Sequence, residues 1–230
     1  NNVKAILKCL SNRLGCKPSE IIIMSTGIIG RQLPMNNIIN SISKNPMNDY
    51  STIMDAAKSI MTTDKYPKYL SKSYKINSKK ISFKGICKGA GMIEPNMATM
   101  LGFIETNVKI TAKALSKYLK YCAELSFNSI SVDGDTSTND CVALTTTNEI
   151  PIDLSKKSNE NKFLECATDF FIELSSLIVK DGEGATKFIQ LNVISAKNKN
   201  IAQEICKKVS QSLLVKTAMN GEDPNWGRII

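Results

Sequence analysis

The chain has 230 residues, of which 42% are hydrophobic and 22% charged, and its formal net charge is +9. These values are ordinary for a globular protein with one large domain or two small ones. The apolar runs are too short to cross a bilayer, and no signal-peptide pattern is present, so no membrane partner is predicted. The lysines are spread along the chain without an arginine cluster, which argues against nucleic acid. A basic nucleic-acid-binding domain remains an alternative.

Cysteine and histidine content limits the available chemistry. Seven cysteines occur without a C-x-x-C pair, which predicts no zinc site and reduced thiols in a cytosolic or organellar compartment, of which the cytoplasm is the predicted one. The chain has no histidine, so Ser-His-Asp and Cys-His catalysis are excluded within it. A covalent enzyme built on this chain needs another base, such as a lysine, a carboxylate or the α-amine of an N-terminal threonine.

The predicted elements alternate between helices and strands. The apolar spacing predicts helices over 3–14, 36–43, 52–61, 112–127, 162–179 and 201–209. Short apolar or alternating runs predict strands over 20–25, 81–87, 99–105, 188–195 and 213–217. The polar stretches 65–80 and 153–161 are interpreted as a surface loop and a surface linker. This order predicts a mixed α/β layered fold.

The segment Lys88-Gly89-Ala90-Gly91-Met92-Ile93-Glu94-Pro95-Asn96-Met97-Ala98-Thr99-Met100-Leu101 is the most informative part of the chain. Its glycines and proline precede Thr99, whose hydroxyl would attack the carbonyl of Ala98 and form an ester that water hydrolyses. Cleavage would free an α-amine with a pKa of roughly 7.7–8.0, which can act as a base for the threonine hydroxyl. On its own, Ala-Thr is more often the opening of a buried strand.

Two other segments bear on the chemistry. Ser25-Thr26-Gly27-Ile28-Ile29-Gly30 follows an apolar run, and Thr26 and Gly27 offer a hydroxyl and an unobstructed N–H for an oxyanion hole. Alone, this segment is only a turn signal. The stretch 131–140, with its aspartates, suggests calcium, but an EF-hand needs glycine at position six and glutamate at position twelve. It has neither, and is interpreted as a hydrogen-bonded loop near the site.

Six motifs, in the same order, resemble the ornithine acetyltransferase family (bifunctional glutamate N-acetyltransferases) of arginine biosynthesis. The resemblance implies cleavage between Ala98 and Thr99, with Thr99 as the nucleophile. Thr26 and Gly27 match the oxyanion hole of the family. The motifs are 25–35, 60–64, 88–101, 131–140, 181–187 and 221–228.

The resemblance also implies substrate-binding residues. Thr63 matches the second threonine of a Met-Thr-Thr-Asp motif, Lys88 a lysine that contacts the amino-acid substrate, and Glu183 a glutamate that binds substrate. Thr99 contacts substrate as well. Taken singly, Thr63, Lys88 and Glu183 are each more often solvated surface residues.

The family implies an αββα sandwich and an exchange of an acetyl group from N-acetylornithine to glutamate, with release of ornithine and without a metal or organic cofactor. Some members also accept acetyl-coenzyme A. Residues 1–98 would be the C-terminal part of the α chain and 99–230 the N-terminal part of the β chain, the two chains forming a heterotetramer. Family members extend beyond both ends, so an internal fragment is expected. A self-processing aminopeptidase or amidase is the alternative within enzymes.

Overall fold

The computed structural model describes residues 2–45, 51–93, 100–135 and 137–230. It divides into two compact units, Asn1–Asp55 and Ala56–Ile230. In the first unit, helices α1 (Asn2–Leu14) and α2 (Met35–Lys44) pack against each other. A short 3-10 helix covers Pro18–Glu20, and α3 (Ile53–Ser59) spans the boundary between the units. The first unit is therefore helical throughout its described regular elements.

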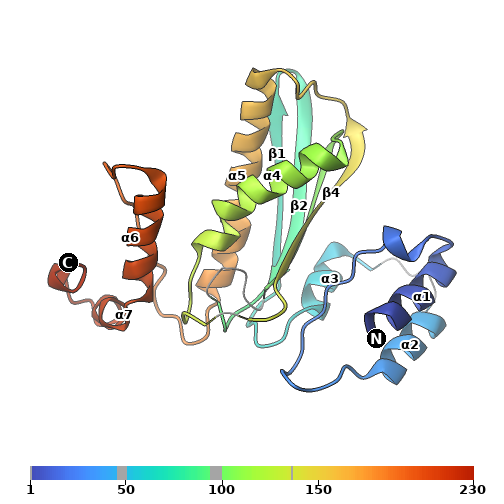
Figure 1. Ribbon diagram of the computed structural model, residues 1–230, viewed down its shortest axis with the longest axis horizontal. Coiled ribbons are helices and arrows are strands. Elements are labelled where there is room, and N and C mark those ends of the chain that lie inside the picture. The colour runs from blue at the N-terminus through green and yellow to red at the C-terminus, as the bar shows by residue number, and fades with distance from the viewer. Residues whose placement is uncertain (1, 46–50, 94–99, 136) are drawn as a thin grey trace. The chain divides into compact units, whose positions relative to one another are not determined.

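A four-stranded sheet forms the centre of the second unit (Figure 1). Its strands β1 (Lys68–Ile76), β2 (Lys79–Lys88), β3 (Leu101–Val108) and β4 (Cys141–Ile150) lie in sequence order. The first three strands are antiparallel, and β4 runs parallel to β3. Lys88, the last residue of β2, pairs with Leu101, the first residue of β3, so the chain leaves and re-enters the sheet at neighbouring positions.

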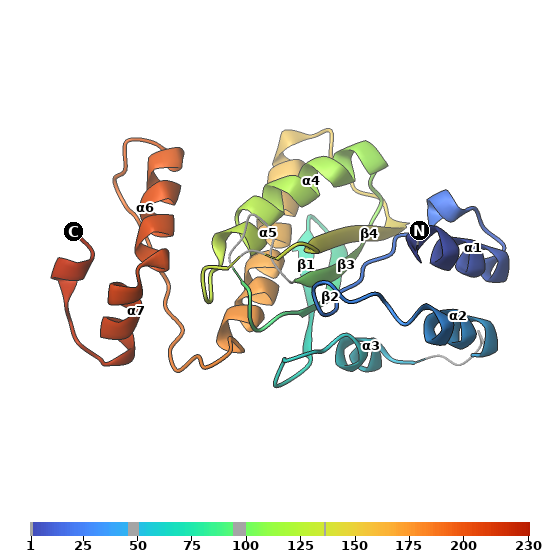
Figure 2. The same ribbon diagram turned by 60° about the horizontal axis from the view of Figure 1, so that its bottom comes forward.

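Two helices, α4 (Ala112–Glu124) and α5 (Lys157–Lys180), cover the same face of the sheet, as Figures 1 and 2 both show. The core between them contains Phe83 of β2, whose ring stacks on that of Phe170 with centroids 5.5 Å apart. A Cβ at Gly85 would lie 2.9 Å from Cδ2 of Leu174. Glycine there lets α5 approach β2 closely, which fixes the end of α5 relative to the end of β2.

The C-terminal part of the second unit consists of α6 (Lys199–Gln211), α7 (Leu213–Asn220) and a 3-10 helix at Trp226–Arg228. Another 3-10 helix, Phe127–Ser129, follows α4. Across the described ranges, no helix combines the length and apolar character that a membrane span requires.

The predicted α/β class is confirmed, and all six predicted helices are present. In the described residues the structure has one sheet flanked by helices; the second sheet of an αββα sandwich is not among them. The division at residues 98 and 99 concerns processing and remains a prediction.

Several predicted elements differ in the structure. The apolar run 213–217 belongs to α7, because the Ser212 side chain accepts a hydrogen bond from the Val215 N–H and caps a helix. The runs 20–25 and 188–195 pair with no strand in the described parts of the chain. The supposed loop 65–80 contains β1, the supposed linker 153–161 contains the start of α5, and β4 was not predicted.

Candidate functional site

Lys88, the last residue of β2, is a buried lysine that the sequence analysis selected for substrate binding. Neighbouring residues in a strand face opposite sides, so Lys88 points away from the face on which Cys87 contacts α5. Lys88 is 1% exposed, and its Nζ donates a hydrogen bond to Oγ1 of Thr62 at 2.6 Å. Burial lowers the pKa of Lys88, while the negative charge of Asp64 acts in the opposite direction. An ammonium group has three donors, so Lys88 can bind a further acceptor.

A second buried lysine, Lys68, lies at the start of β1 and holds two carboxylates together. Its Nζ is 2.6 Å from Oδ1 of Asp64 and 2.6 Å from Oδ2 of Asp181. All three side chains are at most 1% exposed. Two carboxylates and one ammonium leave one negative charge in this group, and Lys88 supplies the neighbouring positive charge.

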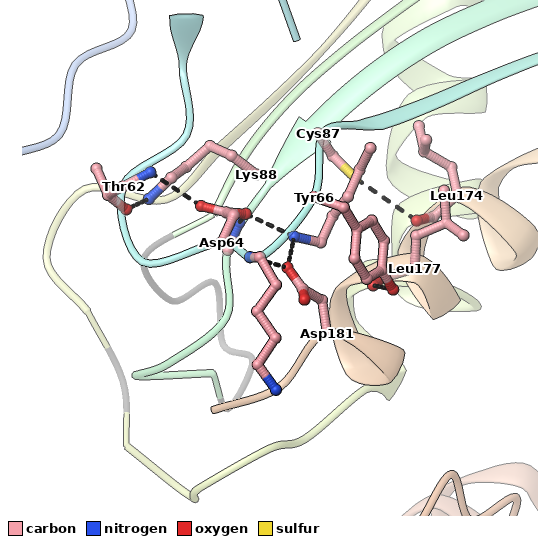
Figure 3. A network of polar contacts seen from close by, with 11 residues as sticks. Thr62, Asp64, Tyr66, Cys87, Lys88, Leu174, Leu177 and Asp181 are labelled. Carbon is pink, nitrogen blue, oxygen red and sulfur yellow. Dashed lines mark hydrogen bonds and ion pairs between the residues drawn. The ribbon is translucent and has the colours of Figure 1, made fainter. Parts of the chain in front are cut away.

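Asp64 connects this ion network to the residues around Lys88. Oδ1 also accepts a hydrogen bond from the N–H of Gly89 at 2.8 Å, and Oδ2 accepts one from the N–H of Thr62 at 3.0 Å. Burial raises the pKa of Asp64, but the hydrogen bonds from Gly89, Lys68 and Thr62 outweigh it and keep the pKa below its ordinary value. Figure 3 shows Asp64 between the Thr62–Lys88 pair and Asp181. One ionised carboxylate therefore fixes both the 62–64 turn and the end of β2.

Asp181 connects the same network to Glu183. It lies at the C-terminal end of α5, where the helix dipole disfavours a negative charge, and the ammonium of Lys68 offsets this. Oδ2 of Asp181 also accepts a hydrogen bond from the Lys65 N–H at 3.0 Å. Two residues later, the N–H of Glu183 donates to the carbonyl of Ala90 at 2.7 Å. The ion network therefore anchors the turn that carries Glu183.

The carboxylate of Glu183 lies directly over Gly91. A Cβ at position 91 would be 2.8 Å from Cδ of Glu183 and 2.9 Å from each of its oxygens, which is closer than real Cβ atoms approach. Glu183 is exposed, so it presents a negative charge to solvent beside Gly91, which follows the buried Lys88 by three residues. The structure thus brings together two of the predicted substrate-binding residues with opposite charges.

The structure does not test the roles predicted for the other residues. Thr62 and Thr63 lie on the same turn and both are exposed, but it is Thr62 that contacts Lys88. Thr26 and Gly27 belong to the first unit, between the 3-10 helix at Pro18–Glu20 and α2. Ala98 and Thr99 lie outside the described residues. The roles assigned to all of them remain predictions.

Sequence analysis assigned no role to Thr62, Lys68 or Asp181, although each holds part of the site. The Thr62 and Asp181 motifs were noted, but only Thr63 and Glu183 were selected from them. Lys68 stands in a lysine-rich stretch that was interpreted as a loop. Over the described ranges, no group of three or more Cys, Asp or Glu side chains is arranged to hold a metal ion.

Comparisons with known proteins agree with the motifs. The chain matches the model of the ArgJ family over residues 1–230. It is 45% identical over 228 residues to the mitochondrial arginine biosynthesis bifunctional protein ArgJ of Dictyostelium discoideum, covering 96% of this chain and 51% of that protein. It is 44% identical over 223 residues to the protein of that name from Lodderomyces elongisporus, covering 93% of this chain and 51% of that protein.

A solved structure is also similar. The crystal structure of the arginine biosynthesis bifunctional protein ArgJ from Bacillus halodurans aligns with a TM-score of 0.52 and 37% identity. The alignment covers 55% of this chain and 61% of that one. The fold described above is therefore shared with that protein over the aligned part.

The comparisons correct the predicted location and show what share of its relatives' length the chain spans. The two curated relatives are named as mitochondrial, so the predicted cytoplasmic location is wrong; reduced thiols do not distinguish the cytoplasm from another reducing compartment. The chain spans about half the length of these relatives, 51% of each. The match of the family model to the whole chain confirms the resemblance seen in the motifs, and the chain belongs to the ArgJ family.

Proposed function

We propose that the chain supplies the nucleophile and part of the amino-acid site of an enzyme that moves an acetyl group from N-acetylornithine to glutamate in arginine biosynthesis. One observation carries the proposal: the buried ammonium of Lys88 and the exposed carboxylate of Glu183 are held at one end of the sheet by one ion network. A site with one charge of each sign is suited to a zwitterionic amino acid. The relatives named for arginine biosynthesis support the same substrate class.

Each charged group has a defined task in this proposal. The ammonium of Lys88 binds the substrate carboxylate as a compact point charge, and its burial strengthens that attraction. The carboxylate of Glu183 binds a substrate ammonium group. Thr62 keeps Lys88 in place through its hydroxyl, and Thr63, on the same turn, contacts substrate.

The covalent steps use Thr99. Its hydroxyl attacks the Ala98 carbonyl, and water hydrolyses the resulting ester, which leaves Thr99 with a free α-amine. That amine takes the proton of the hydroxyl as the oxygen attacks the acetyl carbonyl of N-acetylornithine. Thr26 and Gly27 donate to the oxyanion, and ornithine leaves after taking up the proton. The amine of glutamate then attacks the acetyl ester and restores Thr99.

The proposal includes the assembly and the acetyl donors. Residues 1–98 and 99–230 belong to the α and β chains of one precursor, which form a heterotetramer in the mitochondrion. No metal or organic cofactor takes part, because the covalent step activates the acetyl group. Acetyl-coenzyme A is the second donor to test. Neither nucleic acid nor a membrane is a partner.

An isotope-transfer experiment tests this function. The complete gene product is mixed with N-acetylornithine and ¹⁵N-glutamate, and the products are followed by mass spectrometry. We expect ¹⁵N-labelled N-acetylglutamate and ornithine in equal amounts, and neither with Thr99→Ala. Release of acetate that glutamate fails to divert would contradict the transfer and indicate the amidase instead.

A further inference from the structure

The segment that contains the proposed cleavage bond is held at its N-terminal end by Asp133. The two oxygens of Asp133 accept hydrogen bonds from the N–H groups of Met92 and Ile93, the latter at 2.8 Å. The N–H of Val132 donates to the carbonyl of Ile93 at 2.6 Å. The backbone on this side is therefore fixed immediately before residue 94.

The C-terminal end of the segment is held in the same manner by Asp140. Oδ1 of Asp140 accepts a hydrogen bond from the N–H of Met100 at 2.6 Å. The N–H of Cys141, the first residue of β4, donates to the carbonyl of Met100 at 2.9 Å. The bonded N–H belongs to the peptide group that Met100 shares with Thr99.

These contacts repeat one arrangement at both ends. At each end an aspartate side chain accepts from the segment, and the backbone N–H of the aspartate's neighbour donates to the segment. We propose that residues 132–133 and 140–141 form a clamp across the cleavage segment, and that Asp133 and Asp140 are positioning residues for self-cleavage at Ala98–Thr99. The inference rests on the self-cleavage in the proposed function.

The clamp supplies what an attack within the chain requires. A hydroxyl reacts with the preceding carbonyl only when the two are held in a near-attack arrangement, and small displacements cost about 100-fold in rate. Fixing residues 93 and 100 limits the conformations available to the residues between them. The pairing of Lys88 with Leu101 limits the same segment from the side of the sheet.

Asp140 is the more important of the two aspartates because of its surroundings. Asp133 is exposed, whereas Oδ2 of Asp140 is buried and bonds to no atom in the described ranges. Buried acceptors without partners are rare in folded proteins. Burial raises the pKa of Asp140 to about 6, while the Met100 N–H and the charge of Lys88 act in the opposite direction. At neutral pH the carboxylate is ionised, and a charge-assisted bond to Met100 is stronger than a neutral one.

The rate of self-cleavage in the complete gene product tests the clamp. Intact mass is followed over time for the wild type, Asp140→Ala, Asp140→Asn and Asp133→Ala, with Thr99→Ala as the uncut reference. A charge-assisted hydrogen bond corresponds to about 10- to 100-fold, and we expect Asp140→Ala to cleave more slowly by that factor. Asp133→Ala should be slowed less. Asp140→Asn keeps an oxygen acceptor for the Met100 N–H but not the charge, and should recover part of the rate.

Asp135→Ala is the matched control, because Asp135 carries the same charge in the same loop and its side chain bonds to no described residue. It should cleave at the wild-type rate, and thermal denaturation shows which variants remain folded. Equal cleavage by Asp140→Ala and the wild type would overturn the clamp alone. An equal loss of cleavage rate in Asp140→Asn and Asp140→Ala would also overturn it, since self-cleavage would then need the charge of Asp140 and not its hydrogen bond. An uncut wild type would overturn the self-cleavage itself, and the clamp with it.

Discussion

Two lysines of β1, Lys68 and Lys72, face the same side of the sheet, and each is paired with two carboxylates. Lys68 contacts Asp64 and Asp181, and all three side chains are at most 1% exposed. Lys72 contacts Asp169 and Glu173 of α5, and these side chains are 29%, 54% and 43% exposed. The same chemistry is therefore present four residues apart, once inside the protein and once at its surface.

The difference between these two groups shows that an ion pair fixes the positions of its neighbours when it is buried and not when it is exposed. An exposed pair is screened by water and contributes little. A buried ion without its partner is very costly, so the buried group has to stay together. Asp64 and Asp181 also bond to backbone N–H groups of the site, at Gly89 and Lys65. Lys68 thereby fixes the positions of residues that never touch it.

Removing Lys68 should have the largest effect. Lys68→Met leaves two carboxylates buried without a cation, and we expect a loss of about 3–5 kcal/mol in the free energy of unfolding. Urea denaturation of the purified variant measures this loss. Lys68→Met combined with Asp181→Asn removes one of the charges and should recover part of the stability. A loss below about 1 kcal/mol, the size of a surface pair, would contradict the organising role of Lys68.

Filling the space at Gly91 should weaken substrate binding while the ion network remains intact. In Gly91→Ala the new methyl group meets the Glu183 carboxylate and displaces it, and loss of one charge-assisted bond corresponds to about 10-fold in KM for the amino acid. Steady-state kinetics measure this change. Glu183→Gln should raise KM similarly, and the double variant should be no worse than either single variant. Additive effects would show that Gly91 acts elsewhere.

The stability of Asp140→Asn relative to the wild type should depend on pH. The folded pKa of Asp140 is about 6, above the ordinary 3.8, so the fold favours the protonated form. That contribution is complete below the unfolded pKa and is lost as pH rises through about 6. The melting temperature of Asp140→Asn minus that of the wild type should therefore increase between pH 4 and pH 7.5. A constant difference over this range would show that Asp140 has an ordinary pKa.

The surface group should give the smallest effect. The hydrogen bond that Lys72 donates to Glu173, followed by the one that it donates to Asp169, raises the pKa of Lys72, yet these side chains are partly exposed to water. We expect Lys72→Met to change the free energy of unfolding by less than about 1 kcal/mol, and to leave KM unchanged. Urea denaturation beside Lys68→Met checks the first value. Losses of equal size in the two variants would remove the distinction between the groups.

The sequence was sufficient to select the two charged residues that are proposed to bind the substrate. Lys88 and Glu183 were selected because their motifs resemble those of the family, and the structure holds both near Ala90 and Gly91. It could not identify Lys68, because the partner Asp181 is 113 residues away in sequence, and pairing at such a distance depends on how α5 packs on β1. Patterns in neighbouring residues of the sequence do not indicate that packing.

The same pairing explains why β1 was interpreted as a loop. Its helix-facing positions include Lys68 and Lys72, which are acceptable there because carboxylates at the end of α5 and on its side neutralise them. A rule that places apolar residues on the inner face fails when charges are paired across it. The error at 213–217 has another origin, since a short apolar run fits a strand and a helix equally well.

The acetylation state of Thr99 is the most direct test of acetyl transfer through this residue. The complete gene product is mixed with N-acetylornithine without glutamate, quenched, digested and analysed by peptide mass mapping. If Thr99 carries the acetyl group, we expect a peptide that begins at Thr99 and has one acetyl group on its side-chain oxygen. This group should be lost when glutamate is added before quenching. A folded protein that yields ornithine while Thr99 remains unmodified, or remains joined to Ala98, would contradict it.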